Sequence, residues 1–115
     1  MNIVSFQVAK FLFNLGYREL TMYKYSKKTE DRIFWFQGSD SDYSAPTYED
    51  AIEFLWKIKI AQIYCTPCGS GCKGVVCVPN LNKTFTTKHQ FPSPSEAYVA
   101  CMNILISKNE SILLC

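Results

Sequence analysis

The sequence has no long apolar run and almost no net charge. A membrane-spanning helix needs about 20 consecutive apolar residues, and no stretch of this chain approaches that length. The 12 basic and 10 acidic residues leave a net charge of only +2, so bulk charge indicates neither a nucleic-acid nor a membrane partner. The opening residues do not resemble a signal peptide, because Lys10 and Asn14 interrupt the apolar pattern. We therefore expect a cytoplasmic protein with reduced thiols and no membrane partner.

The sequence patterns that usually carry catalysis are missing as well. His89 is the single histidine, and a cysteine–histidine pair would need the fold to place a thiol beside it. No phosphate-binding glycine loop, serine nucleophile elbow or helical zinc-protease pair occurs. The polar segment Ser39–Asp42 lacks the glycine and the distal glutamate of a calcium loop. We expect no catalytic residues and a protein that is not an enzyme.

The chain does contain enough apolar material for a packed core. Of its 115 residues, 48% are hydrophobic and 15% are aromatic, which is typical of a folded globular domain. We predict a single α+β domain over residues 1–115, ordered α-ββ-α-ββ-α, with an antiparallel sheet and helices packed against it. Strand-like runs precede both later helices, so two ββα-like units are expected at about residues 20–60 and 62–108.

Ala45–Ile60 is predicted to be an amphipathic helix. Thr47 is a natural N-cap, and Glu49 and Asp50 follow in the first turn, where the helix dipole favours acidic side chains. Apolar residues recur with helical spacing, which predicts a face turned to the core. The members of this face are Tyr48, Ala51, Ile52, Leu55 and Ile58.

A second capped helix is predicted at Pro92–Ile106. Ser93 as N-cap, Pro94 at the first helical position and Glu96 three residues after the cap form a capping-box pattern. Alignment of this helix with the previous one predicts which residues face the core. They are Ala97, Tyr98, Cys101, Ile104 and Leu105.

Ser5–Leu15 is predicted to be a first helix, with Ser5 as its N-cap and Gly16 as the left-handed residue after its C-terminus. One of its faces is apolar, and Phe6 and Phe13 make much of a second face apolar. A helix that is apolar on two sides is either covered on both sides by the core or exposes one side to a partner. The sequence leaves these two possibilities open.

Two hairpins are predicted. Leu20–Ser26 and Arg32–Gln37 are rich in aromatic and β-branched residues and flank a polar turn. The segment that follows them is expected to be a flexible polar loop. The second hairpin combines strands at Gln62–Cys65 and Gly74–Pro79 around a glycine-rich turn. A further short strand is possible around Thr84–Thr87.

The second hairpin also holds the densest cluster of cysteines. Cys65, Cys68, Cys72 and Cys77 have the spacing C-x2-C-x3-C-x4-C, and four close thiolates can bind zinc tetrahedrally. Two alternatives stay open: the cysteines are free thiols in strands and a turn, or they form a disulfide across the hairpin. The spacing matches no standard zinc site, so zinc is considered only as a structural metal.

The first hairpin combines basic and aromatic residues. Aromatic rings can stack on bases, and cationic side chains can contact phosphates. The candidate nucleic-acid-binding residues are Lys24, Lys27, Lys28, Arg32 and Trp35. The alternative is a sheet whose aromatic face lies under helices and whose basic turn is solvated.

Four stretches of the chain resemble small proteins carried by phages and prophages of gut anaerobic bacteria. They are VSFQVAKFLFNLGY, YSAPTYEDAIEFLWKI, the hairpin with GSGCKGVV, and FPSPSEAYVACMNILI. The resemblance covers about residues 3–106 and rests on pattern, not on chemical motifs. It implies a protein without an assigned activity. The capped ββα unit also resembles antitoxin domains with a double-stranded-RNA-binding type of fold.

These observations support three functional hypotheses. The first is a non-enzymatic interaction protein that binds a protein partner or itself through an apolar surface, located on the first helix or on the tail with Ile112, Leu113 and Leu114. The second is a nucleic-acid-binding or antitoxin-like regulator that uses the first hairpin. The third is a structural zinc module that uses the four cysteines.

Overall fold

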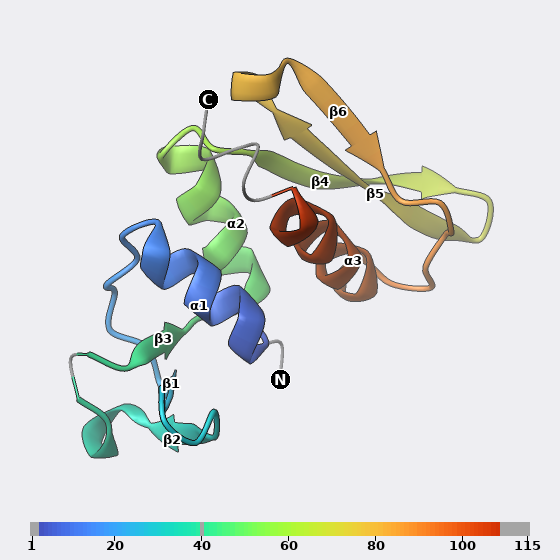
Figure 1. Cartoon of the computed structure of the whole chain (residues 1–115). Coiled ribbons are helices and arrows are strands. Elements are labelled where there is room, and N and C mark those ends of the chain that lie inside the picture. The colour runs from blue at the N-terminus through green and yellow to red at the C-terminus, as the bar shows by residue number, and fades with distance from the viewer. Residues whose placement is uncertain (1–2, 40, 109–115) are drawn as a thin grey trace. The chain divides into compact units, whose positions relative to one another are not determined.

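The computed structural model of the chain describes residues 3–39 and 41–108 (Figure 1). The fold is α+β with antiparallel sheets, as predicted. The chain divides into two compact units, Met1–Ala51 and Ile52–Cys115. Each unit holds a three-stranded sheet, so the prediction of one common sheet is wrong. The physical reason is local pairing, because the third strand of each sheet pairs with the hairpin of its own unit.

The first unit places α1 against a small sheet of order β2-β1-β3. Strand β3 lies in the segment that was predicted to be a flexible loop, and it pairs with β1 along its whole length. The elements of this unit are α1 (Phe6–Asn14), β1 (Tyr23–Tyr25), β2 (Arg32–Phe34), the 3-10 helix η1 (Trp35–Gln37) and β3 (Tyr43–Ala45).

Helix α1 has the predicted caps at both ends. The Ser5 hydroxyl accepts a hydrogen bond from the Val8 amide at 3.4 Å. At the other end, Gly16 has φ of +100°, and the Tyr17 amide donates to the Leu12 carbonyl at 2.9 Å. This is the arrangement in which a left-handed glycine ends a helix.

The second apolar face of α1 packs against the sheet of its own unit. The Phe6 ring lies 5.7 Å from the Tyr25 ring and 5.6 Å from the Tyr43 ring, and Phe13 lies 5.0 Å from Tyr43. The Arg18 guanidinium lies 3.6 Å from the Phe13 ring centroid. Of the two possibilities for α1, the structure shows the covered one, and the candidate surface on the tail falls on residues outside the described ranges.

The second unit has a sheet of order β4-β5-β6, and α3 packs on β4 and β5 (Figure 1). Its hairpin is longer than predicted, because Pro67 does not interrupt β4. A proline is tolerated in an edge strand, and β4 lies at the edge of this sheet. The elements are β4 (Gln62–Cys68), β5 (Gly71–Val78), the 3-10 helix η2 (Pro79–Leu81), β6 (Lys83–Thr86) and α3 (Pro94–Ser107).

Helix α2 (Tyr48–Lys57) has the predicted N-cap. The Asp50 amide donates to the Thr47 hydroxyl at 3.2 Å. Tyr48, Ala51 and Leu55 are buried as predicted. Ile58 is 37% exposed, so its assignment to the core face is wrong, because the helix ends one residue before it.

Helix α3 differs from the prediction at its cap and on its core face. Ser93 occupies the N-cap position but makes no side-chain capping hydrogen bond. Ala97, Cys101 and Leu105 are buried as predicted, and Met102 is buried although it was not predicted. Tyr98 and Ile104 are only half-buried.

The order strand, strand, 3-10 helix, strand, helix occurs twice along the chain. The two sheets nevertheless differ in topology. In the first sheet the third strand pairs with the first strand of the hairpin, whereas in the second sheet it pairs with the second strand. The similarity in element order therefore does not extend to the way the strands are paired.

Gly74 allows α3 to approach β5 closely. A Cβ atom built on Gly74 would collide with the Cys101 sulfur and would lie 3.0 Å from the Ala97 carbonyl oxygen. The Ala97 carbonyl belongs to the helix backbone and cannot rotate away. The absence of a side chain at this position thus determines the spacing between α3 and the sheet.

We expect Gly74→Ala to lower the free energy of unfolding by about 1–3 kcal/mol, because the added methyl group must displace α3 or Cys101. Urea denaturation measures this. The double variant Gly74→Ala/Cys101→Ala should lose less than the sum of the two single losses, because the sulfur is gone. Strictly additive losses would contradict the proposed contact.

Lys59 follows the end of α2 and has the left-handed backbone conformation that usually favours glycine. Its φ is +62°, its amide donates to the Trp56 carbonyl, and the Ile60 amide donates to the Leu55 carbonyl. We expect Lys59→Gly to raise the free energy of unfolding by about 1 kcal/mol, because a left-handed conformation strains an L-residue. Lys57→Gly, inside the last helical turn, is the matched control and should lower it by about 1 kcal/mol. A Lys59→Gly variant no more stable than the wild type would disprove this.

Candidate interaction surface

Four aromatic side chains at the end of the first hairpin contact one another. We call Tyr23, Phe34, Trp35 and Phe36 the aromatic cluster. The Tyr23 and Phe34 rings are stacked at 5.2 Å, and the Phe34 and Phe36 rings are stacked at 5.6 Å. The Trp35 ring meets Phe36 edge-on at 6.2 Å. Rings at these separations stabilise one another, so the cluster is an ordered surface.

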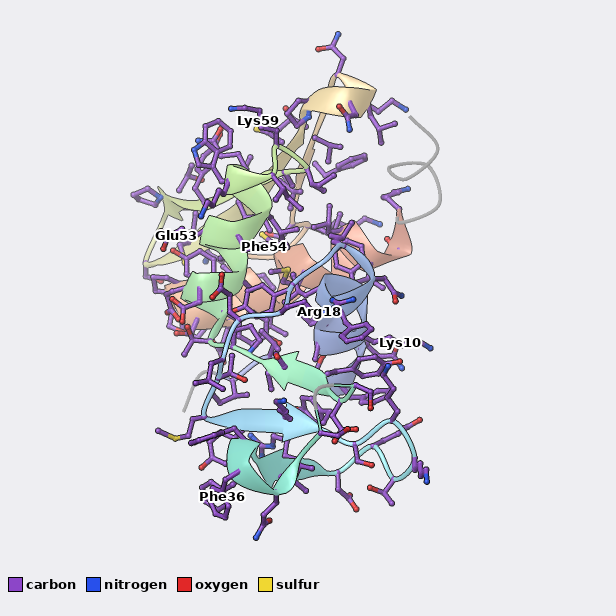
Figure 2. All side chains as sticks on the ribbon, turned by 90° about the vertical axis from the view of Figure 1, so that its left-hand side faces the viewer. Lys10, Arg18, Phe36, Glu53, Phe54 and Lys59 are labelled. Carbon is purple, nitrogen blue, oxygen red and sulfur yellow. The ribbon has the colours of Figure 1, made fainter. Side chains whose placement is uncertain are left out.

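Local backbone structure creates the cluster. Strand β2 ends at Phe34 and passes directly into η1, so Trp35 and Phe36 follow immediately after the last residue of the strand. The Trp35 amide donates to the Met22 carbonyl at 3.1 Å and ties η1 to the residue before β1. Figure 2 shows Phe36 pointing away from the ribbon of η1.

The cluster exposes much of its apolar area. Phe34 is 45%, Trp35 46% and Phe36 65% exposed, and the neighbouring Met22 is 58% exposed. Single exposed apolar residues are common on proteins, but a contiguous group of them marks a contact site. None of the four side chains in the cluster carries a charge.

Lys24, one of the predicted nucleic-acid-binding residues, is largely covered by its own unit. Its side chain is only 8% exposed, and its Nζ donates to the Ser39 carbonyl at 3.0 Å. Lys24 alternates with Tyr23 and Tyr25 along β1, so it points to the other face of the sheet. There the side chain runs beneath Gly38, whose added Cβ would lie 3.0 Å from the Lys24 Cδ.

The other predicted basic residues are exposed, and they lie in the turn of the hairpin or at its turn end. Arg32 pairs with Tyr25 near the turn, whereas Phe34 pairs with Tyr23 at the opposite end. Lys27, in the turn, places its Nζ 4.1 Å from the Phe13 ring centroid. Lys28 also lies in the turn. Of the predicted nucleic-acid-binding residues, only Trp35 lies in the aromatic cluster.

The four hairpin cysteines point to opposite faces of the second sheet. Cys65 pairs with Gly74 and Cys72 with Pro67, so these two thiols share the face that carries α3. Cys68 and Cys77 lie on the other face, because side chains alternate along a strand. The predicted four-thiolate arrangement is therefore not formed. Within residues 3–39 and 41–108, no group of three or more histidine, cysteine, aspartate or glutamate residues has metal-binding geometry.

Three thiols gather around Gly74, and sequence spacing did not reveal this group. Cys65 lies across from Gly74 and Cys72 precedes it by two residues on the same face, while the Cys101 sulfur lies above Gly74. All three are free thiols, as are Cys68 and Cys77, so the structure does not contain the disulfide that was one alternative for the hairpin. Burial raises the pKa of Cys72, and it raises the pKa of Cys101 to about 11.

The remaining polar candidates are engaged in local structure. His89 is exposed in the segment after β6, and its carbonyl accepts a hydrogen bond from the Thr87 hydroxyl at 3.0 Å. In the segment considered as a cation loop, the Ser39 amide donates to the Asp42 carboxylate at 3.0 Å. Asp40 lies outside the described residues. None of these contacts forms a catalytic pair.

No protein-family model, curated protein or solved structure matches this chain. The resemblance to phage-borne proteins therefore stays a prediction from sequence patterns. Among the described residues, no helix has the length and apolar character required to cross a membrane.

We expect the free energy of unfolding to fall as the pH rises from 9 to about 11. The pKa of Cys101 is about 11 in the folded chain against an ordinary value of 9.0, so in this window the unfolded chain ionises first and is stabilised. Below pH 9 both states keep the proton, and this contribution to stability is fully present. Urea denaturation of wild type and Cys101→Ala across this range checks the effect. The variant should show a weaker pH dependence, and an unchanged dependence would exclude Cys101 as its source.

Proposed function

We propose that this chain is a small non-enzymatic interaction protein that binds a protein partner through the aromatic cluster. The observation that carries the proposal is the set of stacked rings of Tyr23, Phe34 and Phe36, with Phe36 65% exposed. The phage-type origin suggested by the sequence patterns is part of this proposal. It determines none of the residues named here.

The chemistry of the cluster supports a protein partner. Aromatic side chains provide a large contact area with few rotatable bonds, and they dominate the binding energy of many protein interfaces. The rings of the cluster already contact one another, so little conformational freedom is lost on binding. Met22, 58% exposed beside Trp35, extends the apolar area and can adapt its shape to a partner.

Binding of single-stranded nucleic acid is the second candidate function. The favourable observation is that parallel exposed rings can stack on bases. Two observations disfavour it: Lys24 is buried, and Lys27 and Lys28 lie in the turn of the hairpin. Phosphate contacts provide most of the affinity for nucleic acids, and Arg32, two residues before Phe34 on β2, is the one predicted basic residue that shares a strand with the rings.

The simplest protein partner is a second copy of the chain. We expect sedimentation velocity to show concentration-dependent association of the wild type, and Phe36→Ser to weaken it by about tenfold or more, since buried aromatic anchors contribute most of the interface energy. Val99→Ser is the matched control, because Val99 is 38% exposed on α3. It should associate like the wild type.

If the wild type is monomeric at all concentrations, a photo-crosslinking amino acid at position 36 tests for a different protein partner. A protein adduct that disappears with Phe34→Ser supports the proposal, and the absence of any protein adduct contradicts it. Salt-sensitive binding of oligodeoxythymidine that is lost with Trp35→Ser would replace the proposal with the nucleic-acid alternative.

A further inference from the structure

A groove of about 550 Å³ opens between β6 and α3 in the second unit. Its floor is apolar and includes Phe85 from β6, Phe91 from the following segment, and Ala100 and Ile104 from α3. Each of these side chains is half-buried. The groove thus joins one strand and one helix over an apolar surface that no other described element covers.

One side of the groove is the edge of a sheet. The sheet order β4-β5-β6 leaves one side of β6 without a neighbouring strand. The Thr87 amide donates to the Gly74 carbonyl at 3.0 Å. Because hydrogen bonds to a single neighbouring strand alternate along an antiparallel pair, Phe85 and Lys83 also bond to β5, whereas the amides and carbonyls of Thr84 and Thr86 point outward.

A side-chain contact between β6 and β5 supports the outward direction of the Thr84 backbone groups. The Thr84 hydroxyl approaches the sulfur of its cross-strand partner Cys77 at 3.6 Å, which fits the close side chains of a pair without backbone hydrogen bonds. Within the described ranges, no hydrogen bond engages the outward backbone groups of Thr84 and Thr86. These groups can therefore accept a further strand.

The charges along the groove have one sign. Lys88 and Lys108 line it, and its lining contains no aspartate or glutamate among the described residues. The Lys108 Nζ lies 5.5 Å from the Phe85 ring centroid, at the apolar floor. An occupant that complements this groove carries negative charge next to apolar groups.

We propose that this groove binds an extended acidic peptide of another protein, which pairs with β6 as an additional strand. Backbone pairing requires a polypeptide, because a nucleic acid has no ladder of alternating amides and carbonyls. Side chains alternate along an extended peptide, so every second one enters the groove and meets Phe85 and Ile104. Acidic residues of the peptide contact Lys88 and Lys108. Edge-strand addition of this kind derives affinity from the backbone and specificity from the side chains.

This site is separate from the aromatic cluster, which lies in the first unit. It does not depend on the function proposed above. Failure of one proposal leaves the other unaffected, because Phe36 lies in the first unit and Thr86 in the second.

The test uses the full chain and a fluorescent peptide of alternating valine and glutamate, with the same peptide carrying lysine instead of glutamate for comparison. We expect saturable binding of the acidic peptide and at least about tenfold weaker binding of the basic one. Lys108→Glu should weaken binding of the acidic peptide about tenfold. The matched control is Lys10→Glu, which makes the same charge change on exposed α1 and should bind like the wild type.

Thr86→Pro tests the backbone pairing directly. Proline removes the outward amide but none that bonds to β5, so an edge strand tolerates it. We expect a thermal midpoint close to that of the wild type and loss of peptide binding. Phe91→Ala tests the apolar floor of the groove. It should weaken binding of the acidic peptide while leaving the outward backbone groups of β6 unchanged.

Several outcomes would overturn the proposal. The proposal is wrong if the wild type does not bind the acidic peptide saturably, if it binds both peptides equally well, or if Thr86→Pro binds the acidic peptide as the wild type does. Self-association of the wild type that Thr86→Pro abolishes would instead make a second copy the occupant. Binding of oligodeoxythymidine that Lys108→Glu weakens and Thr86→Pro leaves unchanged would identify the groove as a nucleic-acid site.

Discussion

The antiparallel register of β4 and β5 controls the structure of the second unit. Because Cys65 pairs with Gly74, the one residue without a side chain on this face lies where α3 comes closest, and the Cys101 sulfur occupies the space above it. A shift by one residue would turn every side chain of a strand to the opposite face. The same register separates Cys65 and Cys72 from Cys68 and Cys77, so a four-thiolate site and the observed packing of α3 exclude each other.

Local signals in the sequence predicted the helices well, because capping depends on neighbouring residues. Ser5, Gly16 and Thr47 all act as the sequence indicated. Strand pairing was harder to predict, since it joins residues that are distant in the chain. Nothing in the local pattern of Tyr43–Ala45 shows that it pairs with β1, and nothing in the spacing of the cysteines shows that Cys101 approaches two of them. The sequence spacing therefore did not show which of the cysteines share a face of the sheet.

The exposure of the aromatic cluster was also hard to predict from sequence, because it depends on which part of the sheet α1 covers. From sequence, Phe6 and Phe13 on α1 could either be covered or face a partner. The structure covers them, because α1 packs on the turn end of the sheet through Tyr25 and Tyr43. The end with Tyr23 and Phe34 receives no such contact from Phe6 or Phe13 and continues into η1. Composition alone cannot make this distinction, since both segments contain the same residue types.

The two candidate surfaces differ in the kind of recognition that they allow. The aromatic cluster offers uncharged side chains at the end of the edge strand β2, so its selectivity depends mainly on shape and apolar area. The groove beside β6 offers outward backbone groups, an apolar floor and positive charge together. A partner must satisfy all three at once, because an unpaired backbone group or an unmatched charge loses free energy when it is buried. The groove therefore restricts its ligands more strongly than the cluster does, although it contains fewer aromatic side chains.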